Sequence, residues 1–181
     1  SFEGSTSVPA GWSVISGGDP EETWAVEDYS NSYGFQAQNG NKTFSIYYSS
    51  TAHNDMLVTP QITVVAGVTD VLTFYGRSRN SNFPETISVK LSATNATSIA
   101  SFSTPLINSV APTTTNFSKY QVSLSSFVGQ TIYIGFLSTT TDQFAFDIDN
   151  VTLGTKTSCK EPTSQRLFAN LTTNSAHVVW G

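Results

Sequence analysis

Hydrophobic and polar residues alternate along most of this chain. In segment 85–93, for example, Ile87, Val89 and Leu91 alternate with polar neighbours. Successive side chains of a strand point to opposite faces, so this period of two predicts strands with one buried face. The pattern recurs in segments 71–79, 119–127, 131–138 and 144–153, and shorter candidates are 11–15, 23–28, 43–49 and 56–65. Helical periodicity is nearly absent, which predicts an all-β protein.

Turn-forming residues separate the predicted strands. Gly, Pro, Asn and Asp gather at residues 16–22, 39–41, 66–70, 79–85 and 109–117. These residue types favour the conformations in which a backbone reverses direction. Parallel strand pairs would need crossover helices, so we expect antiparallel pairing. About nine or ten strands of this kind fit a two-sheet sandwich.

Aromatic residues are expected to fill much of the core. Phe144, Phe146 and Ile148 share one face of the last predicted strand, and we assign Trp12 and Trp24 to the interior as well. The chain has 181 residues and is 38% hydrophobic, which is enough for a packed core in one domain.

The alternation stops near residues 154–162, where Gly, Lys, Ser and Pro cluster. We therefore predict a first domain at 1–155, followed at 156–181 by a linker and the truncated start of a second β-domain. The lone cysteine, Cys159, rules out a disulfide within the chain.

The low charge of the chain limits its possible partners. Only 12% of residues are charged, and the formal net charge is −5 with eight Lys and Arg residues. Binding to a phosphate backbone needs clustered basic residues, so nucleic acid is not expected as a partner. No run approaches the roughly 20 apolar residues of a membrane span. A polar but weakly charged surface rich in Ser, Thr and Asn is typical of secreted β-proteins.

Several segments, in their order, resemble those of a known family. They are SFEG, VPAGW, the isolated Trp24, NDMLVTPQI, LTFYGRSR, ETISVKLSAT, FSKYQVSLSSFVGQTIYIGF and FDIDNVTLG. Residues 1 to about 155 thus resemble the cleaved-adhesin domain, also called the choice-of-anchor J domain, a relative of MAM domains. Met56 departs from this likeness, because the family commonly has Trp there. The tail CKEPTSQRLFANLTTNSAHVVWG is similar to the first two strands of a fibronectin type III domain.

The resemblance implies a jelly-roll sandwich within a larger secreted or surface-located bacterial protein. Such domains often lie beside hydrolases, bind calcium, and are credited with adhesion to host or matrix proteins or glycans. If the first and last strands close the sandwich as this fold implies, Glu3 and Asp149 become neighbours. Two hard oxygen donors favour calcium over zinc.

Three further residues are expected to supply oxygen ligands for the same calcium ion. Asp55 and Asn54 precede an apolar strand, and Asp147 shares a strand face with Asp149 because their spacing is two. Backbone carbonyls would complete the about six to eight ligands of the ion. In the alternative interpretation these acids are solvated at loop ends or cap turns.

The sequence does not favour an enzyme. Its two histidines, His53 and His177, belong to no HExxH, GxSxG or Cys-His pattern. A carboxylate pair could cleave glycosidic bonds. The acids available for such a pair, however, are expected to be loop and edge charges; they are Glu21, Glu22, Glu27, Asp28 and Glu85.

Two function classes remain open. The first is an extracellular, calcium-stabilised adhesin-type module, and the second is a carbohydrate-binding module that targets an attached hydrolase to polysaccharide. A spacer role is a third possibility. Sugar rings stack on flat aromatic faces, and the candidate aromatics for such contacts are Tyr29, Tyr33, Tyr47, Tyr48 and Phe83.

Overall fold

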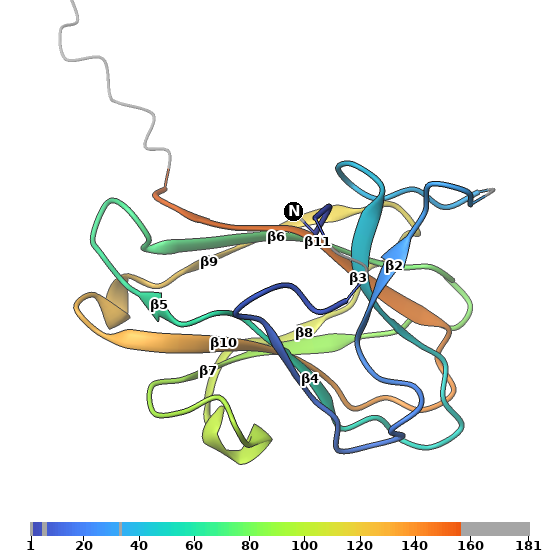
Figure 1. Ribbon diagram of the computed structural model, residues 1–181, viewed down its shortest axis with the longest axis horizontal. Coiled ribbons are helices and arrows are strands. Elements are labelled where there is room, and N and C mark those ends of the chain that lie inside the picture. Colours follow the sequence, from blue (N-terminus) through green and yellow to red (C-terminus); the bar gives the residue numbers. More distant parts are fainter. Residues whose placement is uncertain (1, 5–6, 33, 157–181) are drawn as a thin grey trace, which may run out of the picture.

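Two antiparallel β-sheets pack face to face in this protein (Figure 1). The computed structural model describes residues 2–4, 7–32 and 34–156. The all-β sandwich expected from the alternation is thereby confirmed. Within the described residues, no helix is long and apolar enough to cross a membrane.

The six-stranded sheet has the order β1-β4-β10-β7-β8, and β5 also pairs with β10. Its strands are β1 (Ser13–Ile15), β4 (Asp55–Val58), β5 (Ile62–Thr63), β7 (Ile87–Ser92), β8 (Thr104–Val110) and β10 (Thr131–Ser138). Strands β4 and β5 follow one another along the same edge of β10 because Pro60, which cannot donate to a strand ladder, lies between them. One predicted segment, 56–65, therefore became two strands.

The five-stranded sheet has the order β2-β3-β11-β6-β9. Its strands are β2 (Ala25–Asp28), β3 (Lys42–Tyr47), β6 (Val71–Ser78), β9 (Ser118–Ser123) and β11 (Ala145–Gly154). Two short 3-10 helices, η1 (Ile99–Ser101) and η2 (Ser125–Phe127), lie in connections. Because β11 is central, its outward-facing residues lie between those of β3 and β6, and this placement determines which side chains Asp147 meets.

The core is formed by the inward faces of both sheets, as the alternation predicts. Phe74 of one sheet meets Phe136 of the other edge to face, with ring centroids 5.1 Å apart. Phe44 and Phe146 are likewise fully buried. Trp24 is buried and its indole N–H donates to the Asp55 carbonyl, 3.2 Å away, so its assignment to the core is confirmed.

The sequence failed to predict β8. Its apolar residues, Leu106, Ile107 and Val110, do not alternate, and the pairing of β8 with β7 shifts register twice. An irregular pairing of this kind breaks the period on which the prediction depended. The predicted second β-domain lies, from residue 157 onward, outside the described residues.

Candidate functional site

The N-terminal segment is attached to the sandwich by Phe2. Its buried ring meets Phe44 and Trp12 edge to face, with centroids 4.8 and 5.4 Å away. Trp12 is half-buried and packs against the core, in agreement with its assignment. This aromatic contact holds the next residue, Glu3, against the turn that precedes β3.

Both carboxylate oxygens of Glu3 accept backbone hydrogen bonds from that turn. Oε2 accepts from the N–H of Asn41 and Oε1 from the N–H of Lys42, each at 3.0 Å. Gly40 makes this approach possible. Its φ is +73°, and a Cβ at this position would lie 2.3 Å from the Glu3 carboxyl carbon, so any other residue would displace the carboxylate.

Asp149 reaches the same turn from β11. Its buried carboxylate accepts from the N–H of Asn39 at 3.0 Å through Oδ2, and from the N–H of Asn150 at 2.5 Å through Oδ1. The pairing of β11 with β6 shifts register just after Asp149, where Asn150 has a φ of +51°. Burial raises the pKa of Asp149, although the two backbone donors act in the opposite direction.

The turn at residues 38–42 thus joins Glu3 and Asp149. The expected route was different, because we predicted that the first and last strands would lie side by side. Residues 2–4 are not part of a strand, and β1 belongs to the sheet opposite β11. The contact is made instead by backbone N–H groups of one turn, and we call this group, Glu3, Asp149 and residues 38–42, the turn site.

Asp147 does not belong to the turn site, and its assignment as a calcium ligand needs correction. Arg77 Nη2 lies 2.8 Å from its Oδ2, and Arg79 Nη2 lies 2.7 Å from its Oδ1. The hydroxyls of Ser45 and Tyr29 also donate to this fully buried carboxylate. Two guanidinium groups beside one carboxylate would repel a metal cation. Arg77 belongs to β6 and Arg79 follows the end of that strand, so no spacing within β11 could reveal them.

Aromatic rings cover these two arginines on the outer face of the five-stranded sheet. The guanidinium carbon of Arg77 lies 4.4 Å from the ring centroid of Phe117, and that of Arg79 lies 4.4 Å from the ring centroid of Tyr47. Tyr29 is buried as well, and its burial raises the pKa of its hydroxyl. Tyr29 and Tyr47, predicted as ligand-binding aromatics, therefore support the buried ion pairs.

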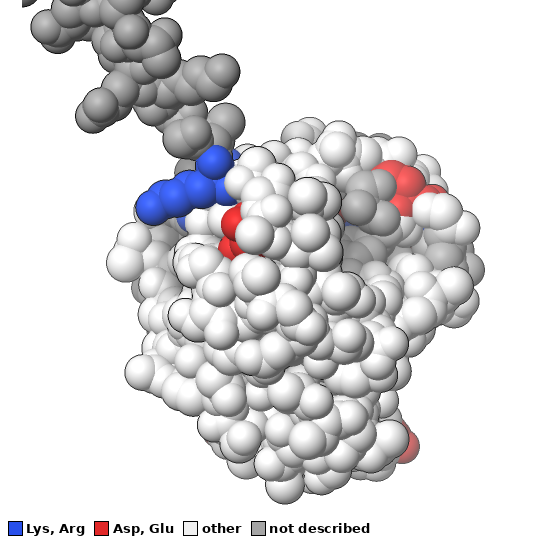
Figure 2. Space-filling model, turned by 90° about the vertical axis from the view of Figure 1, so that its left-hand side faces the viewer, with Lys and Arg blue, Asp and Glu red and all other residues white. Residues whose placement is uncertain are grey.

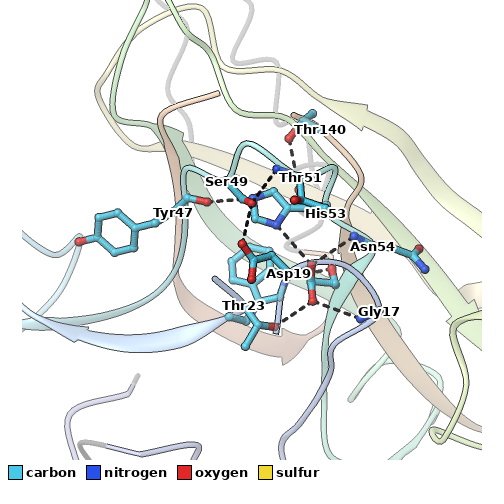
Figure 3. A network of polar contacts seen from close by, with 12 residues as sticks. Gly17, Asp19, Thr23, Tyr47, Ser49, Thr51, His53, Asn54 and Thr140 are labelled. Carbon is cyan, nitrogen blue, oxygen red and sulfur yellow. Dashed lines mark hydrogen bonds and ion pairs between the residues drawn. The ribbon is translucent and has the colours of Figure 1, made fainter. Parts of the chain in front are cut away.

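Asp55 lies in the other sheet, within a separate polar network (Figure 3). Its Oδ1 accepts from the N–H of Gly17 at 3.3 Å and the hydroxyl of Thr23 at 3.2 Å. Its Oδ2 lies 3.3 Å from His53 Nδ1 and accepts from the N–H of Asn54 at 3.2 Å. Asp55 and Asn54 thus take part in hydrogen bonds with the 16–23 and 48–54 loops, and they do not lie at the turn site.

Glu85 differs from the expectation of a loop charge because it is fully buried. Its Oε1 accepts from the hydroxyls of Ser138, at 3.1 Å, and Thr140, whereas its Oε2 has no hydrogen-bond partner among the described residues. Burial raises the pKa of Glu85; the Thr140 and Ser138 hydroxyls and the nearby His53 lower it. Its partners are distant in sequence, so no local signal identified it.

The remaining predicted aromatics differ in their surroundings. Tyr48 and Phe83 are exposed, as a binding role requires, and Tyr33 lies outside the described residues. Phe144, assigned to the core, is 39% exposed; it lies just before β11, which begins at Ala145. A hollow of about 240 Å³ lies elsewhere, beside Trp12; its walls also include Thr59, Pro60, Gln61, Ile62, Leu72, Val151, Thr152 and Leu153.

Uncharged residues dominate the surface. Figure 2 shows one end of the sandwich with few Lys, Arg, Asp or Glu side chains.

Four acids of the described residues are fully buried, and each accepts hydrogen bonds from protein donors. They are Asp55, Glu85, Asp147 and Asp149. The most deeply buried acids thus serve as hydrogen-bond acceptors within the sandwich.

The chain belongs to the cleaved adhesin domain family, because residues 1–153 match the sequence model of that family. This finding confirms the resemblance noted in the sequence for the first domain. A search of curated protein sequences gave no match.

Solved structures show the same fold. The K1 cleaved adhesin domain of Lys-gingipain from Porphyromonas gingivalis W83 is 21% identical, with a TM-score of 0.70 over 86% of this chain and 95% of that one. The K3 domain of the same protein is 20% identical, with a TM-score of 0.67 over 85% and 95%. TmCBM61, solved with β-1,4-galactotriose, is 16% identical, with a TM-score of 0.58 over 86% and 94%.

Proposed function

We propose that this chain is a non-catalytic, extracellular adhesin-type binding module, stabilised by a calcium ion at the turn site. One observation carries the proposal: Glu3 and Asp149, 146 positions apart in the chain, converge on residues 38–42. Family membership supports the binding role, and the weakly charged, hydroxyl-rich composition supports an extracellular location.

The donor chemistry of the turn site suits calcium. Each carboxylate oxygen has two lone pairs, so an oxygen that accepts one N–H can still bind a cation. The carboxylates of Glu3 and Asp149 and the backbone carbonyls of the turn are hard oxygen donors, which calcium prefers. The described residues contain no cluster of three or more His, Cys, Asp or Glu side chains that could hold a metal ion. Backbone carbonyls would therefore have to supply most of the about six to eight ligands.

The role of such an ion would be structural. Calcium supplies positive charge between the two carboxylates and binds no reacting group. Glu3 belongs to the segment anchored by Phe2, and Asp149 belongs to the central strand of a sheet. An ion held by both would link the N-terminal segment to the sheet. Because it binds the native state alone, it would stabilise that state by mass action.

Other acids of the described chain are less suited to chemistry or to metal binding. Asp147 is neutralised by Arg77 and Arg79. Asp55 and Glu85 are buried among structural hydrogen-bond donors. A hydrolytic carboxylate pair needs access to substrate, which full burial denies. This arrangement supports a module that binds and does not catalyse.

Thermal unfolding of the purified chain in millimolar calcium and in excess EGTA tests the proposal. We expect chelation to lower the Tm by several degrees. In the variant Asp149→Asn the two Tm values should nearly coincide. Glu21→Gln removes an exposed carboxylate from the 16–23 loop and should leave the calcium dependence unchanged. A calcium-insensitive melt of the wild-type chain would exclude the calcium part of the proposal.

A second candidate function is a carbohydrate-binding module that brings an attached hydrolase to polysaccharide. The fold likeness to TmCBM61 favours it, as does the likeness to the family 11 module from Clostridium thermocellum, which was solved with a mixed-linked tetrasaccharide. Sedimentation with insoluble polysaccharides and binding to plates coated with matrix proteins separate the two candidates. Retention by polysaccharide alone favours the second.

A further inference from the structure

We propose that Tyr48, Phe83 and Phe144 form a platform that binds the apolar faces of neutral pyranose sugars. This inference rests on the proposed binding function and names its surface and ligand class. The three side chains are 50%, 57% and 39% exposed. They are the exposed large aromatics among the described residues, and all three come from loops at one end of the sandwich.

The register of the five-stranded sheet brings these residues together. Tyr47 pairs with Ala145 across β3 and β11, and Tyr48 and Phe144 are the next residues beyond this pair. The N–H of Phe144 donates to the carbonyl of Phe83 at 3.1 Å, which attaches the β6–β7 loop to the same point. Three chain segments that are distant in sequence thus present one aromatic surface, which we call the aromatic platform.

Hydrogen bonds hold the loops of the platform in place. The Asn80 side chain accepts from the backbone N–H groups of Asn82 and Phe83 at 2.8 and 3.3 Å. The N–H of Asp142 donates to the carbonyl of Ser49 at 3.1 Å, which joins the β10–β11 loop to the loop after β3. A surface that is already ordered loses little conformational entropy when a ligand binds.

The chemistry of the surrounding loops favours a neutral, hydroxyl-rich ligand. Segments 48–52, 80–84 and 139–144 contain Ser, Thr, Asn and Gln, with Asp142 as their single charged residue. The Asp142 carboxylate raises the pKa of the Tyr48 hydroxyl, which places the two groups near each other. Such groups both donate and accept, as sugar hydroxyls do, whereas an anionic ligand would need basic side chains. Flat rings beside neutral hydrogen-bonding groups match a pyranose, which has apolar C–H faces and polar edges.

Three exposed valines are segregated from the platform. Val65, Val68 and Val128 lie where β6 and β10 begin, and the platform lies where these strands end. The N–H of Gly129 donates to the carbonyl of Val64, which places Val128 beside the 65–68 loop. These three valines therefore lie at the end of the sandwich opposite the platform. This segregation provides a matched control, Val68→Ser, that removes exposed apolar surface away from the platform.

Affinity gel electrophoresis tests the proposal. The probes are soluble β-glucan, galactan, mannan and xylan as neutral polysaccharides, with polygalacturonate as an acidic one. We expect at least one neutral polysaccharide to retard the wild-type chain. The double variant Phe83→Ala/Phe144→Ala should weaken that retardation at least about tenfold, as expected for removing central binding residues. Val68→Ser should bind as the wild type does. Each variant is first checked for an unchanged Tm.

The outcomes separate this inference from the function on which it rests. A folded double variant that binds neutral polysaccharide like the wild type would overturn the platform. Retardation by polygalacturonate alone, or binding to matrix protein that the double variant retains, would also overturn it while leaving the adhesin-type function intact. A wild-type chain that binds neither polysaccharide nor matrix protein would contradict both. Asp149→Asn, tested below its Tm, should keep its sugar binding.

Discussion

His53 Nε2 lies 2.8 Å from the carbonyl oxygen of Tyr47, and this contact determines how the ring is protonated. A carbonyl only accepts, so Nε2 must carry a proton and Nδ1 faces Asp55 at 3.3 Å. The pair is ionic when the ring carries its second proton. His53 and Asp55 are both buried, and the histidine thereby links the loop after β3 to the network of Figure 3.

Replacing His53 should therefore destabilise the fold. In His53→Ala the Tyr47 carbonyl and the Asp55 carboxylate each lose a buried partner, at a cost of about 2 kcal/mol in the free energy of unfolding. Urea denaturation followed by circular dichroism measures this change. Thr51→Ala, an exposed position in the same loop, is the control and should change the free energy little. Equal stability of the two variants would contradict the structural role of His53.

Asp147→Asn should be among the most destabilising single substitutions in the chain. It leaves Arg77 and Arg79 without their carboxylate beneath a cover of aromatic rings. Removing one partner of a buried ion pair costs about 3–5 kcal/mol. The midpoint of urea denaturation should fall accordingly, while Asp28→Asn, at an exposed carboxylate, should shift it little. A small effect of Asp147→Asn would show that water reaches these arginines.

The buried Glu85 predicts a specific pH dependence of stability. Its pKa is raised in the folded state, mainly by burial, so ionisation is more costly there than in the unfolded chain. The stability that Glu85 contributes is full below its unfolded pKa and is lost as the pH rises through the folded pKa. The stability of wild type relative to Glu85→Gln should therefore increase as the pH is lowered from 8 toward about 4.5. Urea denaturation of both proteins across this range measures the difference, and the opposite slope would contradict the raised pKa.

Gly40 and Gly67 form a matched pair for testing the turn site. Their φ angles are +73° and +69°. A Cβ at Gly40 would collide with the Glu3 carboxylate, whereas a Cβ at Gly67 would have open space around it to 4 Å. Both Ala variants should lose about 1–3 kcal/mol through backbone strain. Only Gly40→Ala should also reduce the rise in Tm that calcium produces. If both variants keep the full calcium response, Glu3 does not contribute to calcium binding.

Much of the fold could be predicted because strand alternation is a local property. Ile87, Val89 and Leu91 point inward as their spacing required, and so do Phe146 and Ile148. The prediction failed where the period was interrupted, at β8 with its register shifts, and at Phe144, which lies just before β11 and is exposed. The alternation within β11 was right, but it does not determine the direction of a side chain outside the strand.

The candidate sites were predicted less completely. Asp147 and Asp149 are two residues apart on one face, so the sequence could not distinguish them. The structure separates them, because Asp147 meets Arg77 of β6 and Arg79 just after it, whereas Asp149 meets the turn before β3. Glu3 was predicted to join Asp149, and it does approach the same turn, by way of backbone groups that have no sequence signature.

The sequence by itself determined the all-β class, most strand positions and the identity of the family, because each depends on residue types at short spacings. Tertiary structure alone decided which charges are buried against which partners, and which aromatic rings reach solvent. Those outcomes depend on residues brought together from different strands, as Tyr48, Phe83 and Phe144 are at one end of the sandwich. Pairing across a sheet is set by register over the whole fold, and so these surfaces exist only once the two sheets have closed.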